Sequence, residues 1–219
     1  MNPEQQKIIQ QIAEEVKNKL DGEGSGHDWW HIVRVLNMSN HICSSEKANI
    51  FVVQLAALLH DIADWKFNNG DETAGPKIAR EILEKYFVSN DVIDYVCEII
   101  AITSFKGAGV KTEMSTLEGK IVQDADRLDA IGAIGIARTF AYGGYKGRIM
   151  YNPEQKPVLH QSSDAYMKNN SPTINHFYEK LLLLKDRMNT KTAKEIAEGR
   201  HKFMEEYLDR FFKEWDGKI

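Results

Sequence analysis

Apolar residues recur at helical spacing along most of the chain. Ile9, Ile12 and Val16 lie three or four positions apart, which predicts a helix from about Pro3 to Leu20. The same periodicity predicts further helices, one beginning near Asp28 and others over about Lys47 to Asp64, Glu72 to Phe87, Asp91 to Thr103, Thr116 to Phe140, Ile174 to Met188 and Thr192 to Trp215. No segment alternates as a half-buried strand does. The pattern therefore predicts an all-α chain, folded as a single helical-bundle domain over residues 1–219.

Three features refine this outline. The stretch NIFVVQLAALLHDIA (49–63) is apolar almost all round, which indicates a central helix buried on every side. Gly119, Gly132 and Gly135 lie inside the predicted helix over 116–140, where close packing against another element would explain residues that weaken a helix. Between about residues 142 and 172 the periodicity disappears, and so long an irregular loop in a compact domain is usually functional or disordered.

The composition excludes several classes of protein. Of the 219 residues, 42% are hydrophobic and 27% charged, and the net charge of −4 disfavours a binder of nucleic-acid polymers. Cys43 and Cys97 are far apart, so neither a thiolate zinc site nor a disulfide framework is expected. The N-terminus lacks a signal-peptide pattern, and no apolar run reaches the ~20 residues that span a bilayer. We expect a soluble, cytoplasmic protein without a membrane partner.

Two short segments combine histidine with charged residues. Asp28, His31 and Arg34 follow one another at three-residue steps, so they lie near one face of the second predicted helix. His60 and Asp61 stand side by side at the end of the apolar helix. Burial of an imidazole and a carboxylate there is costly unless the two are paired or bind a metal. These residues are therefore candidate metal ligands.

A third segment, QDADRLDA (123–130), places three carboxylates in an otherwise small and apolar stretch. Together the three segments offer two imidazoles, from His31 and His60, and two carboxylates, from Asp61 and one aspartate of 123–130. Two imidazoles and two carboxylates carry a charge of −2 and suit a divalent ion such as Mn, Fe, Co, Ni or Zn. They also leave coordination positions for water and for substrate oxygens, as a catalytic site requires.

The order His, His-Asp, Asp resembles the HD superfamily of metal-dependent phosphohydrolases. His31 stands in a DxxHxxRV setting, His60-Asp61 matches the pair that names the family, and Asp126 lies in the sequence ADRL. Small stand-alone bacterial members share the run DADRLDAIGAIGIAR (124–138) and a segment like INHFYEKLLLLKDRMNT (174–190), so the resemblance covers nearly the whole chain.

The resemblance implies an all-helical hydrolase of phosphate esters or anhydrides, with His31, His60, Asp61 and Asp126 as its metal ligands. In this subgroup it points to a nucleotide substrate, with a nucleoside triphosphate cleaved to monophosphate and pyrophosphate. It also points to manganese, ahead of Fe, Co, Ni, Zn or Mg. Members with two metals carry further histidines between the HD pair and the last aspartate, and none occurs between His60 and Asp126. We therefore expect one divalent ion per chain.

Other residues are assigned roles with less support from the pattern. Asp64 either ends a helix or, as a carboxylate near this position does in related enzymes, orients or deprotonates the attacking water; we favour the second role. Asp28 caps a helix or belongs to the site, and Asp129 faces a substrate sugar or supports a metal ligand. The candidates for substrate binding are Arg34, Lys66, Lys106, Asp129, Lys146, Arg148 and His176.

Three alternatives remain open at this point. The substrate is a nucleoside monophosphate or a guanosine tetraphosphate-like alarmone; or the chain is a non-hydrolytic binding module; or it is an oxygenase, which would need two irons. Many helical surfaces could support a homodimer, and the sequence singles out none of them.

Overall fold

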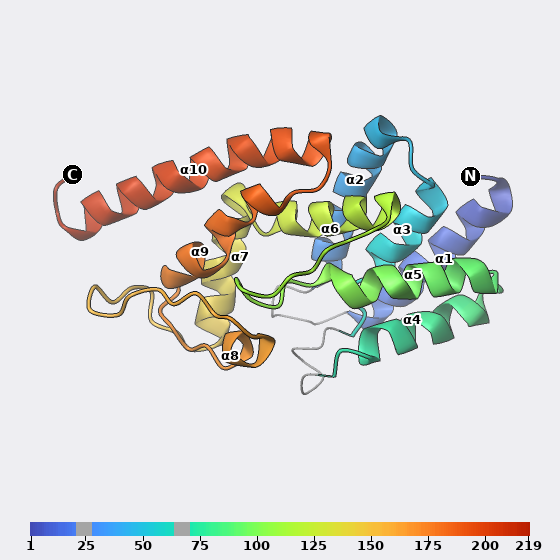
Figure 1. The fold of residues 1–219 in the computed structure, drawn as a ribbon, viewed down its shortest axis with the longest axis horizontal. Helices are drawn as coiled ribbons and strands as arrows, with labels where there is room; N and C mark the ends of the chain where they lie inside the picture. Colours follow the sequence, from blue (N-terminus) through green and yellow to red (C-terminus); the bar gives the residue numbers. More distant parts are fainter. Residues whose placement is uncertain (21–27, 64–70) are drawn as a thin grey trace.

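In the computed structural model, which describes residues 1–20, 28–63 and 71–219, the chain is all-α and the described residues form no strand (Figure 1). This confirms the predicted fold class. The helices are α1 (Pro3–Lys19), α2 (Trp29–Glu46), α3 (Ile50–Leu59), α4 (Ala74–Lys85), α5 (Asn90–Thr103), α6 (Leu117–Asp129), α7 (Gly132–Tyr145), α8 (Ser163–Met167), α9 (Asn175–Glu179) and α10 (Lys191–Trp215). Within the described residues, no helix combines the length and apolarity needed to cross a bilayer.

Helix α3 forms the centre of the fold, as its apolar sequence predicts. Its residues from Leu55 to Leu59 are completely buried, and α3 contacts α1, α2, α5 and α6. In Figure 1 these helices gather with α4 around α3, while α7, α8 and α9 lie beside them and α10 runs across the top. The burial of α3 on every side fixes the position of its C-terminal end, where His60 and Asp61 follow.

The predicted single helix over 116–140 is wrong: the chain breaks between α6 and α7. Gly132 begins α7 with φ +74°, a value that favours glycine and that no right-handed helix contains. A Cβ atom on Gly135 would lie 2.2 Å from the carbonyl oxygen of Ala130, at the end of α6. The two glycines thus allow α7 to turn closely against α6, which is why both occur here.

Three other predicted boundaries need correction. The third helix ends at Leu59, so His60 and Asp61 lie in the turn that follows, and Asp64 lies outside the described residues. The predicted helix over 174–188 is instead α9 followed by the short 3-10 turns η2 (Leu181–Leu183) and η3 (Lys185–Arg187). The loop expected at about 142–172 begins later, because α7 continues to Tyr145, and it contains α8.

Asp124 joins α6 to the start of α10. Its side chain is fully buried and accepts hydrogen bonds from the backbone N–H and side chain of both Asn189 and Thr190, at 2.7–2.9 Å. Thr190 is the N-cap of α10 and itself accepts from the backbone N–H of Ala193. Asp124 is therefore a structural residue that fixes the N-terminal end of α10.

We expect Asp124→Ala to lower the free energy of unfolding by about 3 kcal/mol, because it leaves several buried donors without an acceptor. Urea unfolding followed by circular dichroism measures this change. The matched control is Asp209→Ala, which removes an exposed carboxylate from α10 and is expected to change the free energy of unfolding by less than about 0.5 kcal/mol. Equal effects of the two substitutions would contradict the assignment.

Candidate metal centre and substrate cavity

Two buried histidines face each other at the centre of the fold. His31 lies in the first turn of α2, whose N-cap is Asp28: the Asp28 carboxylate accepts a hydrogen bond of 2.8 Å from the backbone N–H of His31. His60 follows α3, and its Nδ1 lies 2.9 Å from the carbonyl oxygen of Ala57. A carbonyl only accepts, so Nδ1 of His60 carries the proton. The Nε2 atoms of the two rings then lie 3.2 Å apart.

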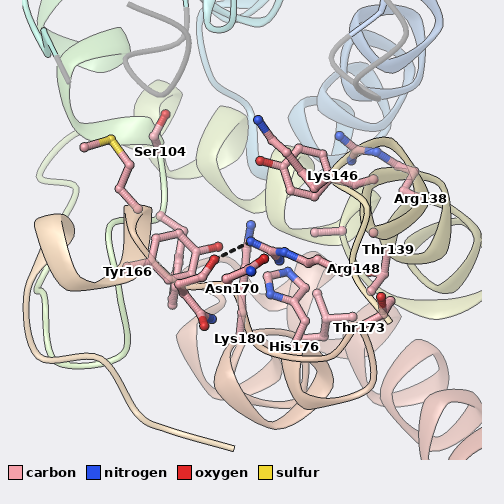
Figure 2. A pocket seen from close by; sticks show the side chains of 18 of the residues that line it. Ser104, Arg138, Thr139, Lys146, Arg148, Tyr166, Asn170, Thr173, His176 and Lys180 are labelled. Carbon is pink, nitrogen blue, oxygen red and sulfur yellow. Dashed lines mark hydrogen bonds between the residues drawn. The ribbon is translucent and has the colours of Figure 1, made fainter. Parts of the chain in front are cut away.

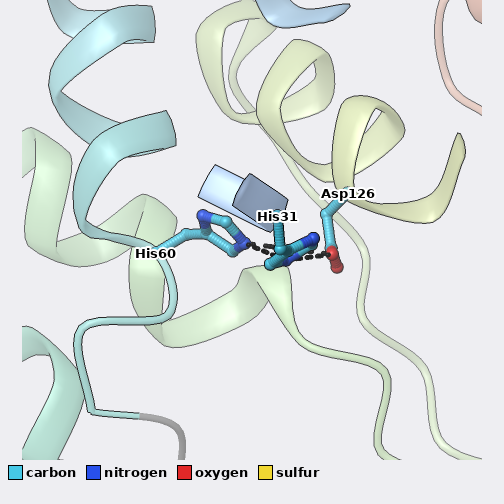
Figure 3. Close-up of side chains that lie close together, drawn as sticks. All are labelled: His31, His60 and Asp126. Atoms are coloured by element: carbon cyan, nitrogen blue, oxygen red, sulfur yellow. Dashed lines mark hydrogen bonds and ion pairs between the residues drawn. The ribbon is translucent and has the colours of Figure 1, made fainter. Parts of the chain in front are cut away.

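Two carboxylates complete this cluster. Asp61 Oδ2 lies 3.2 Å from His31 Nε2 and 3.7 Å from His60 Nε2. Asp126 Oδ1, from α6, lies 3.6 and 3.9 Å from the same two atoms. Ligand atoms about 2.1 Å from a shared ion are separated by about 3.0 to 3.4 Å, depending on the coordination geometry. Figure 3 shows His31, His60 and Asp126 converging in this way.

Asp129 holds His31 from behind. Its Oδ2 lies 2.7 Å from His31 Nδ1, and it also accepts hydrogen bonds from Arg34 at 2.7 Å and Arg138 at 2.7 Å. Burial acts to raise the pKa of Asp129, but the hydrogen bonds from His31 and Arg34, with the charges of His31 and Arg138, hold it far below its ordinary range. Asp129 is therefore a carboxylate, and His31 Nδ1 donates to it. Such a partner orients an imidazole toward a metal.

The donor set fits a divalent cation. With both Nδ1 atoms protonated, the two Nε2 lone pairs and two carboxylates converge on one point, an arrangement that needs positive charge between them. Burial and Arg138 act to lower the pKa of His31, yet Asp129 and Asp61 outweigh them, so the pKa of His31 is raised. The protein thus attracts a cation at this position, and a bound metal ion would take the place of that proton.

A cavity of about 400 Å³ opens from the two carboxylates. One wall is α7, which presents Gly135, Arg138, Tyr142 and Lys146 at successive turns. The opposite wall comes from residues 104–105 and from the segment 166–170, and the floor includes His176 and Lys180 of the α9 region. Figure 2 shows Arg148 pointing into the middle of this space beside His176 and Asn170.

Comparison with known proteins agrees with these residues and their order. A family model described as the HD domain matches residues 29–131, a range that contains all four ligand candidates. The crystal structure of an HD-superfamily hydrolase from Bacillus thuringiensis is 46% identical to this chain, with a TM-score of 0.74, and the match covers 97% of this chain and 98% of that one. The chain belongs to the HD superfamily. It is accordingly a metal-dependent phosphohydrolase.

Two further solved structures resemble this one over nearly their full length. A protein of Lactobacillus plantarum is 36% identical, with a TM-score of 0.87, and the match covers 99% of this chain and 100% of that one. Bacillus subtilis YpgQ, crystallised in complex with ADP, is 38% identical, with a TM-score of 0.74, and the match covers 94% of this chain and 97% of that one. The likeness therefore extends beyond the HD segment to the walls of the cavity.

The structure of this HD protein separates the predicted substrate-binding residues into three groups. Lys146, Arg148 and His176 line the cavity. Arg34, Lys106 and Asp129 are not among its lining residues: Lys106 pairs with Glu72 at 2.7 Å, and Arg34 pairs with the buried Asp129. The predicted catalytic Asp64 and the predicted substrate-binding Lys66 lie outside the described residues.

The sequence interpretation missed several residues of the cavity. Arg138 and Lys180 both line it and add positive charge, and Tyr166 and Asn170 form part of its wall. A signal for the two cations was present, because Arg138 ends the run 124–138 and Lys180 lies in the segment 174–190, both of which carry the family resemblance. Residues 166–170 lie in the stretch without periodicity, where nothing in the pattern distinguishes a cavity wall from a surface loop.

Proposed function

We propose that the protein hydrolyses a nucleotide, with a nucleoside triphosphate cleaved to the monophosphate and pyrophosphate. One observation carries the proposal: a single cavity begins at the carboxylates of Asp61 and Asp126 and is then lined by four cationic side chains. These are Arg138, Lys146, Arg148 and Lys180. A metal ion held by the two carboxylates would bind one phosphoryl group, and the four cationic side chains would bind the additional phosphates of a longer substrate.

The size and the aromatic residues of the cavity support a nucleotide. Its volume of about 400 Å³ falls within the range of about 300–1,000 Å³ typical of small-molecule sites. Tyr142 and Tyr166 line it, and the Tyr166 ring stacks on His176 with centroids 6.5 Å apart. Such rings accept a base on their faces. The ADP complex of YpgQ shows that this relative binds a nucleotide.

The metal ligands in this proposal are His31, His60, Asp61 and Asp126, with manganese as the resident ion and one ion per chain. A bound divalent ion lowers the pKa of coordinated water and neutralises phosphoryl charge. Asp129 keeps His31 in the tautomer whose Nε2 faces the carboxylates. Arg138, which touches Asp129 and lines the cavity, places its charge beside the reacting phosphate. The cations farther along α7 and α9 hold the remaining phosphates and the pyrophosphate that leaves.

We assign the proton-accepting role to Asp64, three residues after Asp61. In this role its carboxylate takes a proton from the attacking water, so Asp64→Asn is expected to retain metal and lose turnover, since an amide cannot accept that proton. Steady-state kinetics together with the metal content of the purified protein measure the two properties separately. Full turnover by Asp64→Asn would remove Asp64 from the mechanism and leave the metal ligands unaffected.

The deciding experiment is an assay of phosphate and pyrophosphate release over a panel of nucleotides. Metal-stripped protein is supplied in turn with Mn²⁺, Mg²⁺, Co²⁺, Ni²⁺ or Zn²⁺. Pyrophosphate release from triphosphates, fastest with Mn²⁺, is the expected result. Phosphate release from monophosphates, or cleavage of a guanosine tetraphosphate alone, would replace the proposed substrate and keep the hydrolase. No turnover with any metal, despite tight metal binding, would favour a binding module.

A further inference from the structure

We propose that Glu179 is a positioning residue that sets the affinity of the cavity for phosphate groups by orienting Arg148 through Asn169. The inference rests on the proposed function, because it takes Arg148 as a phosphate-binding residue. Glu179 is the last residue of α9 and does not line the cavity.

The Glu179 carboxylate is buried beneath one wall of the cavity. Glu179 is 1% exposed. Burial of a carboxylate lowers the stability of the fold unless hydrogen bonds compensate the lost hydration. Three donors do so: the backbone N–H of Val158 at 3.2 Å, the Asn169 side-chain amide at 2.6 Å and the Ser171 hydroxyl at 2.9 Å. All three belong to the segment 158–171. A single buried acid therefore fastens both ends of this segment to α9.

Asn169 transmits this anchoring to the cavity. Its side-chain amide donates to Glu179, while its side-chain oxygen accepts from the backbone N–H of Ser171 at 2.9 Å. Asn169 lies just beyond α8 in irregular backbone, so these side-chain bonds, rather than a helix, fix its conformation. Its carbonyl oxygen then accepts a hydrogen bond of 2.5 Å from Arg148 Nη2.

Arg148 is thereby held with its guanidinium facing the cavity (Figure 2). A guanidinium carries five N–H donors, and those on the cavity side of Arg148 can donate to the oxygen atoms of a phosphate. The guanidinium carbon of Arg148 also lies 5.6 Å from the centre of the Tyr142 ring, a cation–π contact that helps to hold the side chain. The chain from Glu179 through Asn169 to Arg148 thus links a buried acid to an anion-binding side chain.

The test is Glu179→Gln, which keeps the shape of the side chain and removes its charge. In this variant one carboxylate oxygen becomes an NH2 donor, so the three donors share one neutral acceptor oxygen and Asn169 loses its charged acceptor. We expect KM for the best triphosphate and the Kd for ADP to rise by about tenfold, the effect of losing one charge-assisted hydrogen bond. We expect kcat to stay within about threefold and manganese affinity to be unchanged, because no metal ligand is touched.

Rescue separates positioning from general stability. In the double variant Glu179→Gln with Asn169→Asp, the glutamine amide donates to the new carboxylate, so the hydrogen bond returns with its direction reversed. The Kd for ADP is then expected to return to within about threefold of the wild-type value. Ser171→Ala is a milder second variant, for use if Glu179→Gln does not fold, and is expected to raise this Kd by about threefold. Glu154→Gln, which removes the charge of an exposed acid, is the control.

These measurements distinguish a failure of the role of Glu179 from a failure of the proposed activity. If folded Glu179→Gln keeps its Kd for ADP and its KM within twofold of the wild type, the role of Glu179 is overturned, and the proposed activity is unaffected. Loss of ADP binding in Glu179→Gln without any hydrolysis by the wild type would support that role and overturn the proposed activity. A failure of the double variant to recover would reduce Glu179 to a structural residue, and a wild type that binds neither ADP nor inorganic pyrophosphate would overturn both proposals.

Discussion

Replacement of Asp126 by alanine is expected to abolish metal binding and to lower kcat/KM by about 10³-fold or more, equivalent to about 4 kcal/mol of transition-state stabilisation. The Asp126 oxygen lies 3.6 and 3.9 Å from the two histidine Nε2 atoms, whereas Asp129 of the same helix contacts the opposite nitrogen of His31. Its loss leaves one carboxylate, Asp61, to balance a divalent charge. Metal content after reconstitution and pyrophosphate release measure the two effects.

The fold should survive this substitution. Asp126 is partly exposed, and its carboxylate and that of Asp61 lie against the same two histidine nitrogens. Removal of one of two like charges relieves repulsion, so the metal-free variant is expected to be as stable as the metal-free wild type. Saturating manganese is expected to stabilise the wild type by about 2.7 kcal/mol at a hundredfold excess over Kd, and to have no effect on the variant. Thermal unfolding with and without Mn²⁺ tests this. A manganese-dependent rise in Tm for Asp126→Ala would show that Asp126 is not a ligand.

The sequence could predict which side chains meet at the candidate metal centre, because they stand in short segments with a clear physical meaning. His60 and Asp61 follow a helix that is apolar on every side, and an imidazole and a carboxylate buried there must be paired or bind a metal. The periodicity of Ile32 and Val35 placed His31 on the second helix. Each of these signals is local, so the helices could be assigned one at a time and the ligands followed from them.

The cavity was harder to predict, because its walls depend on contacts between distant segments. Arg34 and Arg138 look alike in the sequence, yet both bind Asp129 and only Arg138 lines the cavity. Lys106 pairs with Glu72 instead. The break between α6 and α7 arises from the close approach of Gly135 to Ala130, which periodicity does not reveal. The buried Glu179 was likewise indistinguishable from a surface acid of an amphipathic helix.

Asp129→Asn is expected to show that the metal centre depends on a residue that does not bind the metal. The asparagine keeps the size of the side chain but cannot accept hydrogen bonds from His31, Arg34 and Arg138 together. The His31 ring then loses the partner that fixes its tautomer, and manganese affinity is expected to fall by about 10- to 100-fold.

The same substitution should lower the free energy of unfolding by about 2 kcal/mol, which is less than for a fully buried ion pair because Arg34 and Arg138 are partly exposed. Calorimetric titration with Mn²⁺ and urea unfolding measure the two effects, and Asp94→Asn, an exposed partner of Arg80, is the matched control. A loss of stability without a loss of manganese affinity would mean that Asp129 serves only to pair with Arg34 and Arg138. A loss of affinity at unchanged stability would place its whole contribution in the orientation of His31.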